Sequence, residues 1–354
     1  MRSSCLKIPK TLGQRAIEMT YKLGLYDQNL RIEHEGNCLY VPLSRQPSEK
    51  EKETLGKNLQ NMEVCVHDFS TLVSRPKGFV DLLAEWLPPH LVTSLPRSAD
   101  FVGDIAVIEI PAELEAYRYK IGETILTANK RVHTVLAKAS AISGVYRTRE
   151  FEIIAGEPKT ATVHREYSCV FYIDLSKAYF SPRLSSEHAR IAKLVNERET
   201  VIDMFAGVGS FAIQIAKQHE KARVYAVDIN PDAIEFLNKN IIANRVLTKV
   251  TPVLGDVRKV VNERFVGVAD RVIMNLPEKA LEYVDVACEA LKPIGGIIHY
   301  YAFTEASEPK KTTEVRLVEA IEKTQRKIDE ILTSRIVRAT APYTWQVVVD
   351  AKIK

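Results

Sequence analysis

Hydrophobic and polar positions follow a regular order from residue 186 onward. Short apolar runs rich in β-branched residues, typical of buried strands, are separated by longer segments with apolar positions at helical spacing. Repeated strand and helix segments of this kind predict an α/β fold, a doubly wound parallel sheet with helices on both faces. The expected helices cover 187–195, 210–218, 232–244, 282–291 and 312–332, and the expected strands cover 200–205, 223–229, 250–256, 271–276, 295–303, 334–342 and 344–353.

The N-terminal part of the chain shows a less regular pattern. Ile17, Tyr21 and Leu25 recur at near-helical spacing, and residues 30–43 are typical of a hairpin that turns at a Glu-Gly-Asn sequence. The charged stretch 44–61 fits an exposed helix better than a linker. These elements predict a small α+β module.

The sequence pattern changes near Pro76, which separates this module from the middle of the chain. From about residue 82 to 180, proline and glycine punctuate short apolar runs, which predicts strands. The length of 354 residues suits two or three domains. We therefore expect an N-terminal module over 1–68, a middle α+β domain over 69–180 and the doubly wound domain over 181–354.

Composition places the chain among ordinary globular proteins. With 46% hydrophobic and 27% charged residues it can bury a large core, and no apolar run is long enough to span a membrane. The net charge of +4 is mildly basic, which suits a polyanionic partner without requiring one. The five cysteines show no metal-ligand spacing, and no secretion signal is recognised, so we expect reduced thiols, a cytoplasmic location and no metal site.

A glycine-rich turn follows the first strand of the doubly wound domain. Gly207 and Gly209 permit left-handed backbone angles and let a ligand approach the start of the next helix. Asp203, Asp228 and Asp256 fall at the ends of three successive strands, so in a parallel sheet they gather at one edge. A carboxylate at the second strand end suits ribose hydroxyls, and one at the third can accept from the exocyclic amine of adenine. Each aspartate is also a common helix cap or turn residue.

A dinucleotide and S-adenosylmethionine are the two ligands that such an edge suits. The turn lacks the third glycine of the dinucleotide fingerprint, and Asp203 precedes it where a carboxylate would repel a pyrophosphate but suit the cationic methionine end of S-adenosylmethionine. The combination D-x-F-A-G-x-G, D-x-N-P and G-D resembles class I methyltransferases, which implies a Rossmann-like domain and S-adenosylmethionine as cofactor. The resemblance assigns cofactor binding to Asp203, Phe205, Ala206, Gly207, Gly209, Asp228, Asp256, Val257 and Asn275.

The fourth strand ends in Asn275, Leu276 and Pro277. Proline removes a backbone donor and fixes φ, so the chain leaves the sheet with its last carbonyl groups toward the site. Methyltransferases that act on exocyclic amines carry a [DNS]-P-P-[YF] motif here, whose oxygens hold the amine. Because Glu278 follows and no aromatic residue does, an ordinary strand-ending turn is the simpler alternative to a substrate-holding motif.

Three segments together carry a more specific resemblance. N-L-P, the D-M-F-A-G-V-G turn and Y-F-S-P-R-L-S-S-E-H-A-R-I-A resemble the archaeal and eukaryotic tRNA (guanine(37)-N1)-methyltransferase family, and the match extends to 95–111 and 143–157. The resemblance implies a monomeric enzyme with two smaller α+β RNA-binding domains before the Rossmann-like domain. Its expected partner is tRNA, methylated on the guanosine 3′ of the anticodon. Magnesium bound through the tRNA is compatible with this picture and needs no site on the protein.

The resemblance also implies roles for individual residues. Guanine N1 carries a proton, so methylation there needs a base and a cation that stabilises charge on O6. Glu187 matches the base and Arg147 the O6 partner, although the sequence leaves Arg149 open as an alternative. Glu187 also suits the first turn of a helix, where the helix dipole favours a carboxylate. Asn275 and the backbone of Pro277 would orient the base edge, and Tyr179 and Arg183 would contact the substrate.

Three rival functions stay open. A wyosine-pathway methyltransferase or aminocarboxypropyl transferase would use the same cofactor on the same nucleotide, although the retained Glu187 favours methyl transfer to a protonated ring nitrogen. A nonenzymatic RNA-binding scaffold would not need carboxylates at three strand ends. A methyltransferase for a small molecule or a protein would leave the two N-terminal modules unexplained.

Overall fold

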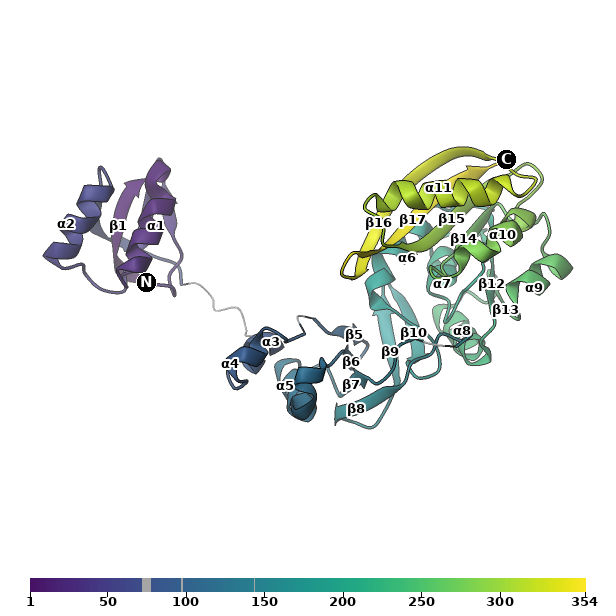
Figure 1. Cartoon of the computed structure of the whole chain (residues 1–354), viewed down its shortest axis with the longest axis horizontal. Helices are drawn as coiled ribbons and strands as arrows, with labels where there is room; N and C mark the ends of the chain where they lie inside the picture. Colours follow the sequence, from purple (N-terminus) through teal and green to yellow (C-terminus); the bar gives the residue numbers. More distant parts are fainter. Residues whose placement is uncertain (72–77, 97, 143) are drawn as a thin grey trace. The chain divides into compact units, whose positions relative to one another are not determined.

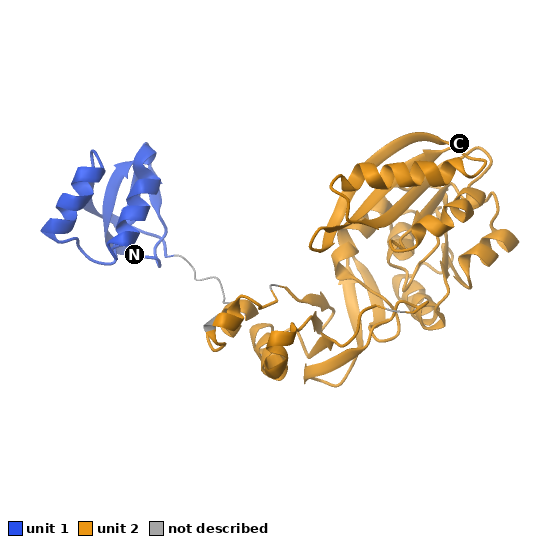
Figure 2. Ribbon diagram, in the orientation of Figure 1, with its two compact units in different colours: residues 1–78 blue, residues 79–354 orange. Residues whose placement is uncertain are grey.

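The chain folds into two compact units, residues 1–78 and 79–354 (Figure 2). The structure is a computed structural model that describes residues 1–71, 78–96, 98–142 and 144–354. The predicted domain boundaries at 68 and 180 stay predictions, and Pro76 lies outside the described residues. None of the helices in the described ranges is long and apolar enough to cross a membrane.

The first unit is a four-stranded antiparallel sheet with helices on one face, in the strand order β2-β3-β1-β4. The hairpin predicted at 30–43 and the helix predicted within 44–61 are both confirmed, and the helix begins with a capping box between Ser48 and Glu51. The core includes Leu6, Val41 and Leu55. The elements are β1(Arg2–Pro9), α1(Gly13–Lys22), β2(Glu33–Glu35), β3(Cys38–Pro42), α2(Glu49–Asn58) and β4(Glu63–Asp68).

The second unit begins with a region that was predicted to be α+β, but for which the sequence pattern predicted only strands and no helix. Three helices, α3(Phe79–Ala84), α4(Pro89–Val92) and α5(Arg118–Ala128), accompany its sheet. Ile121 and Ile125 lie four residues apart on one face of α5 and pack in the core that covers the sheet, a helical spacing that the proline and glycine punctuation obscured. The sheet has the order β5-β6-β7-β8 and is followed by the hairpin β9–β10; the strands are β5(Asp100–Val102), β6(Ile105–Ile108), β7(Thr134–Lys138), β8(Phe151–Gly156), β9(Ala161–Glu166) and β10(Cys169–Asp174).

The rest of the second unit is a seven-stranded sheet in the order β13-β12-β11-β14-β15-β17-β16 (Figure 1). Its first five strands are parallel, and β17 joins β15 antiparallel, so the predicted doubly wound sheet is confirmed. The strands are β11(Thr200–Asp203), β12(Arg223–Asp228), β13(Val250–Leu254), β14(Arg271–Met274), β15(Gly296–Thr304), β16(Ile328–Ala341) and β17(Thr344–Ile353).

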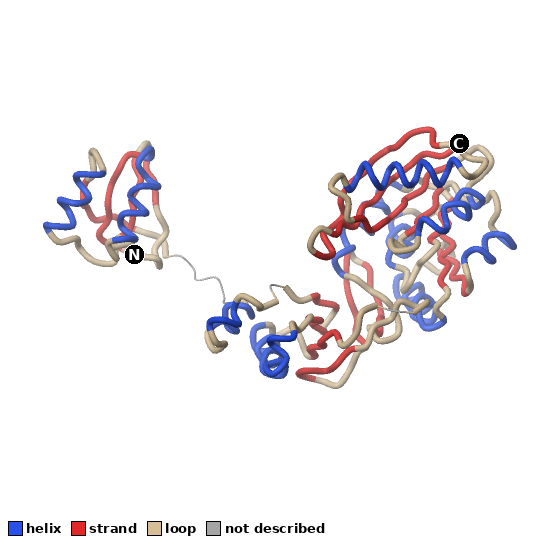
Figure 3. Tube along the Cα trace, in the orientation of Figure 1, coloured by secondary structure: helices blue, strands red, loops and turns tan. Residues whose placement is uncertain are grey.

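Helices cover both faces of this sheet, as Figure 3 shows. Successive side chains of a strand point to opposite faces, so Val201 of β11 enters one core and Ile202 the other. The first core receives side chains from α6(Ser185–Leu194), α7(Ser210–Gln218) and α8(Pro231–Asn244), and the second from α9(Val257–Arg264), α10(Val284–Ala290) and α11(Pro309–Glu322). The ends of the parallel strands are therefore left as the open edge.

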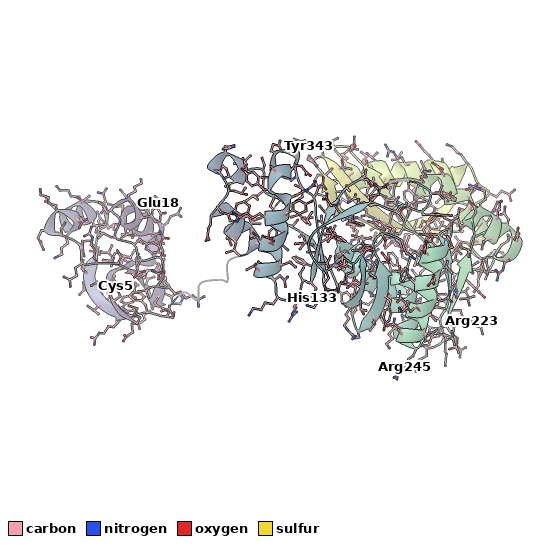
Figure 4. All side chains as sticks on the ribbon, turned by 90° about the horizontal axis from the view of Figure 1, so that it is seen from below. Cys5, Glu18, His133, Arg223, Arg245 and Tyr343 are labelled. Atoms are coloured by element: carbon pink, nitrogen blue, oxygen red, sulfur yellow. The ribbon has the colours of Figure 1, made fainter. Side chains whose placement is uncertain are left out.

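The predicted C-terminal helix was too long. We expected it over 312–332, but α11 ends at Glu322 and β16 starts at Ile328. A polar turn separates them, in which the hydroxyl of Thr324 donates to the carbonyl of Ile321, and Ile328 then pairs with Ile353 of β17. The predicted pairing of the last two strands is confirmed, and Figure 4 labels Tyr343 at the exposed turn between them.

Gly209→Ala is expected to lower the free energy of unfolding of the second unit by about 3 kcal/mol through left-handed strain and overpacking. Gly209 has a φ of 94°, and a Cβ there would lie 2.4 Å from Cδ1 of the buried Leu237. The matched control is Gly144→Ala, where φ is 71° but a Cβ meets nothing within 4 Å, so strain alone costs about 1 kcal/mol. Urea denaturation measures both losses, and equal losses would contradict the prediction.

Candidate cofactor and substrate site

The turn after β11 is shaped by two glycines. Gly207 has a φ of 55°, and a Cβ there would meet only the carbonyl of Tyr179, at 3.7 Å, so the backbone is left open on that side. Gly209 occupies the position before the first residue of α7. Open backbone leading into a helix N-terminus is suited to close contact with a ligand.

Asp228, the last residue of β12, fastens this turn. Its Oδ2 accepts a hydrogen bond from the backbone N–H of Gly207 at 2.6 Å, and its Oδ1 accepts from that of Asn230 at 2.9 Å. Burial raises the pKa of Asp228 in spite of these bonds. The carboxylate that the sequence assigns to a ribose therefore also holds the glycine turn against the second strand.

Asp203, the last residue of β11, is buried without a partner. Neither carboxylate oxygen makes a hydrogen bond of good geometry within the described part of the chain, although the backbone of Phe205 is close enough to oppose the rise in pKa. Burial, reinforced by the neighbouring charge of Asp228, raises the pKa of Asp203 to about 8. Buried carboxylates are normally paired, so this group is suited to a cationic ligand.

Asp256 serves as the N-cap of α9. Its Oδ1 accepts from the backbone N–H groups of Arg258 at 2.9 Å and Lys259 at 3.3 Å. The interpretation of Asp256 as a helix cap is confirmed. Asp256 also lines the cavity beside Val257, and its role as an acceptor for adenine stays a prediction.

One cavity brings most of the predicted residues together. Asp203, Gly209, Arg183 and Glu187 are not part of its lining, whereas ten others are: Arg147, Tyr179, Phe205, Ala206, Gly207, Asp228, Asp256, Val257, Asn275 and Pro277. Sequence reasoning missed further lining residues that come from the last hairpin and from β15, among them Phe303, Arg338 and Gln346. No local motif marks these, since only the strand order brings them to the site.

A second cavity adjoins the first. The two share Arg147, Tyr179, Glu278 and Arg338 on their linings. The second adds a group of cationic side chains, Lys138, Arg149 and Arg183. This concentration of positive charge suits a phosphate-bearing ligand next to the cofactor edge.

Arg147 lies on the border of the two cavities. Its Nη1 contacts Oε2 of Glu278 at 2.8 Å, and its guanidinium carbon lies 5.4 Å from the ring centre of Tyr179. Arg149 lines only the second cavity, and its Nε is buried without a hydrogen-bond partner in the described ranges. Arg183 forms an ion pair with Asp100. The position of Arg147 favours it over Arg149 for contact with both ligands.

Glu187 is fully buried near the start of α6 and does not reach the cavity. Its Oε1 accepts from Nε of Arg190 at 2.6 Å and from the hydroxyl of Tyr301 at 2.8 Å, and its Oε2 accepts from Nη2 of Arg335 at 2.8 Å. These donors occupy most of the acceptor sites of the carboxylate. The role of Glu187 as a base stays a prediction, and it requires the side chain to leave at least one of these partners and to reach the cavity.

The cluster around Glu187 continues into the sheet. Arg190 also pairs with Asp350, whose Oδ1 lies 2.6 Å from Nδ1 of His299. Although burial opposes it, hydrogen bonds from His299 and Arg190 hold the pKa of Asp350 at about 2. This buried network ties α6 to β15 and β17.

His188, the next residue of α6, does line the cavity and was missed from the sequence. Its Nδ1 lies 2.8 Å from Oε1 of Glu166, and Nε2 of Gln214 donates to the same oxygen at 2.8 Å. Although burial opposes it, the bond to His188 holds the pKa of Glu166 below its usual value. The imidazole is thus held in a fixed position beside the glycine turn.

Comparison with known proteins covers nearly the whole chain. The TRM5/TYW2 methyltransferase domain matches residues 162–331, the TYW2 N-terminal domain 79–160 and the tRNA methyltransferase 5 N-terminal domain 5–51. The tRNA (guanine(37)-N(1))-methyltransferase Trm5b of Pyrococcus abyssi is 38% identical over 348 residues, 98% of each chain. The chain belongs to the TRM5/TYW2 methyltransferase family.

Two further members of this family bear on the substrate. The tRNA 4-demethylwyosine(37)-methyltransferase Taw21 of Saccharolobus solfataricus is 35% identical but covers only 72% of this chain, and 94% of its own length. A solved structure described as the complex of aTrm5 and tRNALeu is 34% identical, covers 99% of both chains and superposes with a TM-score of 0.69. The Trm5b protein of Pyrococcus abyssi and the aTrm5 structure thus match this chain over nearly its full length.

S-adenosylmethionine is the cofactor of this class I methyltransferase fold, and the residues present fit it. Asp203 itself does not line the cavity, but it directly precedes the lining residues Met204 and Phe205, where a buried carboxyl group favours a nearby ammonium group, and the open backbone at Gly207 leaves room for the ligand. Asp228 and Asp256 line the same cavity, and their predicted roles as acceptors for ribose and adenine stay predictions. In the described ranges, no group of three or more histidine, cysteine or acidic side chains is arranged to hold a metal ion.

Binding of S-adenosylmethionine is expected to release about one proton from Asp203. With a pKa of about 8 the free carboxyl group is protonated at lower pH, whereas a bound ammonium group favours the ionised form. The complex therefore binds fewer protons than the free protein, so the affinity should rise between about pH 5.5 and 7, by at most about tenfold per pH unit. Isothermal titration calorimetry in buffers of different ionisation enthalpy counts the protons released.

The matched control is Asp203→Asn, which keeps the size of the side chain and cannot titrate. It should bind S-adenosylmethionine more weakly and without proton release. Proton release that persists in Asp203→Asn, or an affinity that falls as the pH rises over this range, would assign the titration to another group.

Proposed function

We propose that the protein is a tRNA (guanine(37)-N1)-methyltransferase, which transfers the methyl group of S-adenosylmethionine to N1 of the guanosine 3′ of the anticodon. The observation that carries this proposal is the pairing of two cavities across a shared wall. One has the carboxylates of the cofactor edge, and the other has the cationic side chains that suit an RNA strand. The full-length relatives named for this activity support it.

The reaction needs groups that act on the guanine as its N1 proton leaves. When bound, S-adenosylmethionine supplies an electrophilic methyl group. Arg147 can donate to O6 and stabilise the charge that develops there, because a guanidinium has only donors and lies on the border between the two cavities. Asn275 and Pro277 line the first cavity, where they would orient the base edge beside Tyr179.

Glu187 is proposed as the base that takes the N1 proton, and the structure indicates which bond must open first. Arg335 is its most exposed partner, with 40% of its side chain accessible, against 18% for Arg190. Because Glu187 is fully buried, loss of a partner is costly, but the exposed Arg335 can be solvated more readily than Arg190 when it leaves. Oε2 is therefore the oxygen that can become free to accept a proton.

The tRNA is proposed to contact both compact units. Arg183, predicted as a substrate contact, lies with Lys138 and Arg149 on the second cavity, where cations can neutralise phosphates. The first unit matches the N-terminal domain model of the tRNA methyltransferase 5 family, which supports a role in tRNA binding. A monomer in the cytoplasm stays the expected state.

The relatives that act on wyosine precursors are the second candidate. The Taw21 match leaves about a quarter of this chain uncovered, whereas the Trm5b proteins of Pyrococcus abyssi and Methanocaldococcus jannaschii cover 98% and 99% of it. Other relatives named for guanine methylation cover 63–74% of the chain, so the preference for guanosine as substrate rests on the two Trm5b matches. Activity on a tricyclic derivative in addition to guanosine is decided by the product analysis below.

A tRNA transcript with guanosine directly 3′ of the anticodon is expected to accept one methyl group, and the same transcript with adenosine there to accept none. The reason is that only guanine offers an acidic N1 next to an acceptor oxygen. Mass spectrometry of the nucleosides should show N1-methylguanosine. An aminocarboxypropyl adduct, methylation of a wyosine precursor alone, or no product at all would contradict the proposal.

Glu187→Gln and Arg147→Ala are each expected to lower the single-turnover methylation rate by about 10², because each removes a group that acts on the guanine. Binding of S-adenosylmethionine should stay close to wild type in both, since neither residue is assigned to the cofactor. Rapid-quench kinetics and equilibrium dialysis measure the two quantities.

Arg335→Ala is the control for the buried cluster. It removes one partner of Glu187 and leaves the carboxylate in place, so its rate should stay within a few-fold of wild type. A loss of about 10² in this variant as well would show that the ion-pair cluster, and not proton removal by Glu187, explains the effect.

A further inference from the structure

Three polar side chains form a continuous chain along the wall of the cofactor cavity. Nε of Arg338 donates to Oε1 of Gln346 at 2.8 Å, and Nε2 of Gln346 donates to Oδ1 of Asn275 at 3.5 Å. All three residues line the cavity, and Gln346 is almost fully buried. The last hairpin thus reaches the residue that ends the fourth strand of the parallel sheet.

Arg338 is held firmly at the start of this chain. It faces Gln346 across β16 and β17, next to a shift of register between Ile336 and Arg338 that re-aims the side chain. Its Nη1 donates to the hydroxyl of Ser181 at 2.9 Å, and its Nη2 lies 3.5 Å from that of Tyr179. Within the described ranges no carboxylate forms an ion pair with it, so its charge acts on these neutral acceptors.

The chemistry of arginine decides how both amides are turned. A guanidinium has no acceptor, so the oxygen of Gln346 must face Arg338 and its NH₂ group must face Asn275. Only the oxygen of Asn275 can then accept that bond. The NH₂ group of Asn275 is left for a ligand in the cavity, and it makes no hydrogen bond to any residue that the structure describes.

We propose that Arg338 and Gln346 are positioning residues that fix Asn275 with its NH₂ group toward the methyl acceptor, where it donates to O6 of guanine. The proposal rests on the proposed function and assigns to Asn275 the polarity opposite to that expected from the amine methyltransferase motif. A donor at this place matches the acceptor O6 of guanine and opposes the amino group of adenine. It also stabilises the charge that O6 gathers as N1 loses its proton.

The sharpest test is Gln346→Glu, which keeps the shape of the side chain and its bond to Arg338. Its second oxygen can only accept, so Asn275 must turn and present its oxygen to O6. The single-turnover methylation rate on guanosine tRNA should fall by about 10- to 100-fold. The Kd for S-adenosylmethionine should change by less than about threefold. The charge-matched control is Gln218→Glu, at an exposed position at the end of α7, which should methylate at the wild-type rate.

A double-mutant cycle separates positioning from a general structural role. Asn275→Ala should lose activity by itself, and adding Gln346→Glu to it should cost nothing further, because the group to be oriented is gone. Gln346→Met, which removes the donor without reversing it, should lie between wild type and Gln346→Glu. If thermal denaturation shows that the glutamate variant does not fold, the methionine variant takes its place in the cycle.

Each outcome has a distinct meaning. The positioning role is overturned if Gln346→Glu methylates at the wild-type rate. It is also overturned if the rate losses of Gln346→Glu and Asn275→Ala multiply in the double variant. In either case the proposed function still stands, provided that the wild-type protein methylates guanosine tRNA. A wild-type protein that does not methylate guanosine tRNA overturns both. A non-additive double-mutant cycle with unchanged cofactor binding supports the positioning role of Arg338 and Gln346.

Discussion

The site is organised by two acidic side chains that a parallel sheet brings to one edge. Asp203 and Asp228 end adjacent strands, and burial raises the pKa of both. Asp228 is satisfied by backbone N–H groups of the glycine turn, whereas Asp203 has no hydrogen-bond partner in the described ranges. Removing a carboxylate from water without a partner is costly, so a cation that comes close to Asp203 is stabilised by it. The residues directly after Asp203, Met204 and Phe205, line the cofactor cavity, and the glycine turn and the start of α7 follow them in the chain.

Helix α6 joins this edge to the rest of the second unit. Glu187 and His188 are neighbours on it but face different surroundings, one the buried arginine cluster and the other the cavity wall. Removing one partner from a buried charge cluster is strongly unfavourable, so Glu187 has a structural role whatever its chemistry. A base in this position must exchange an ion pair for a proton. The half-exposed Arg335 is the one partner whose departure leaves the deeper pairs intact.

The parts of the site that could be predicted are those carried by local pattern. Apolar runs and the punctuation after them placed the aspartates at strand ends, because strand length and alternation are short-range properties. The burial of Glu187 could not be foreseen, since Arg335 and Tyr301 lie more than a hundred residues away in the chain. Arg338 and Gln346 were not predicted as site residues for the same reason. Their approach to Asn275 depends on the antiparallel pairing of β17 with β15. Two elements were predicted incorrectly. No helix was placed at α5, where proline and glycine punctuation nearby obscured the helical spacing, and the C-terminal helix was extended through polar residues into the start of β16.

The wall between the two cavities separates the site of the methyl donor from that of the methyl acceptor. Arg147 and Glu278 close it with an ion pair, yet about half of the Glu278 side chain is exposed. Such a pair contributes about 1 kcal/mol or less, so an incoming base can separate it without a large cost. In the proposed reaction Arg147 would exchange a carboxylate for a neutral oxygen, and that exchange would be favourable only for a base that offers an acceptor at this position. The donor-only arginine and the oriented amide of Asn275 would therefore both select for O6 of guanine.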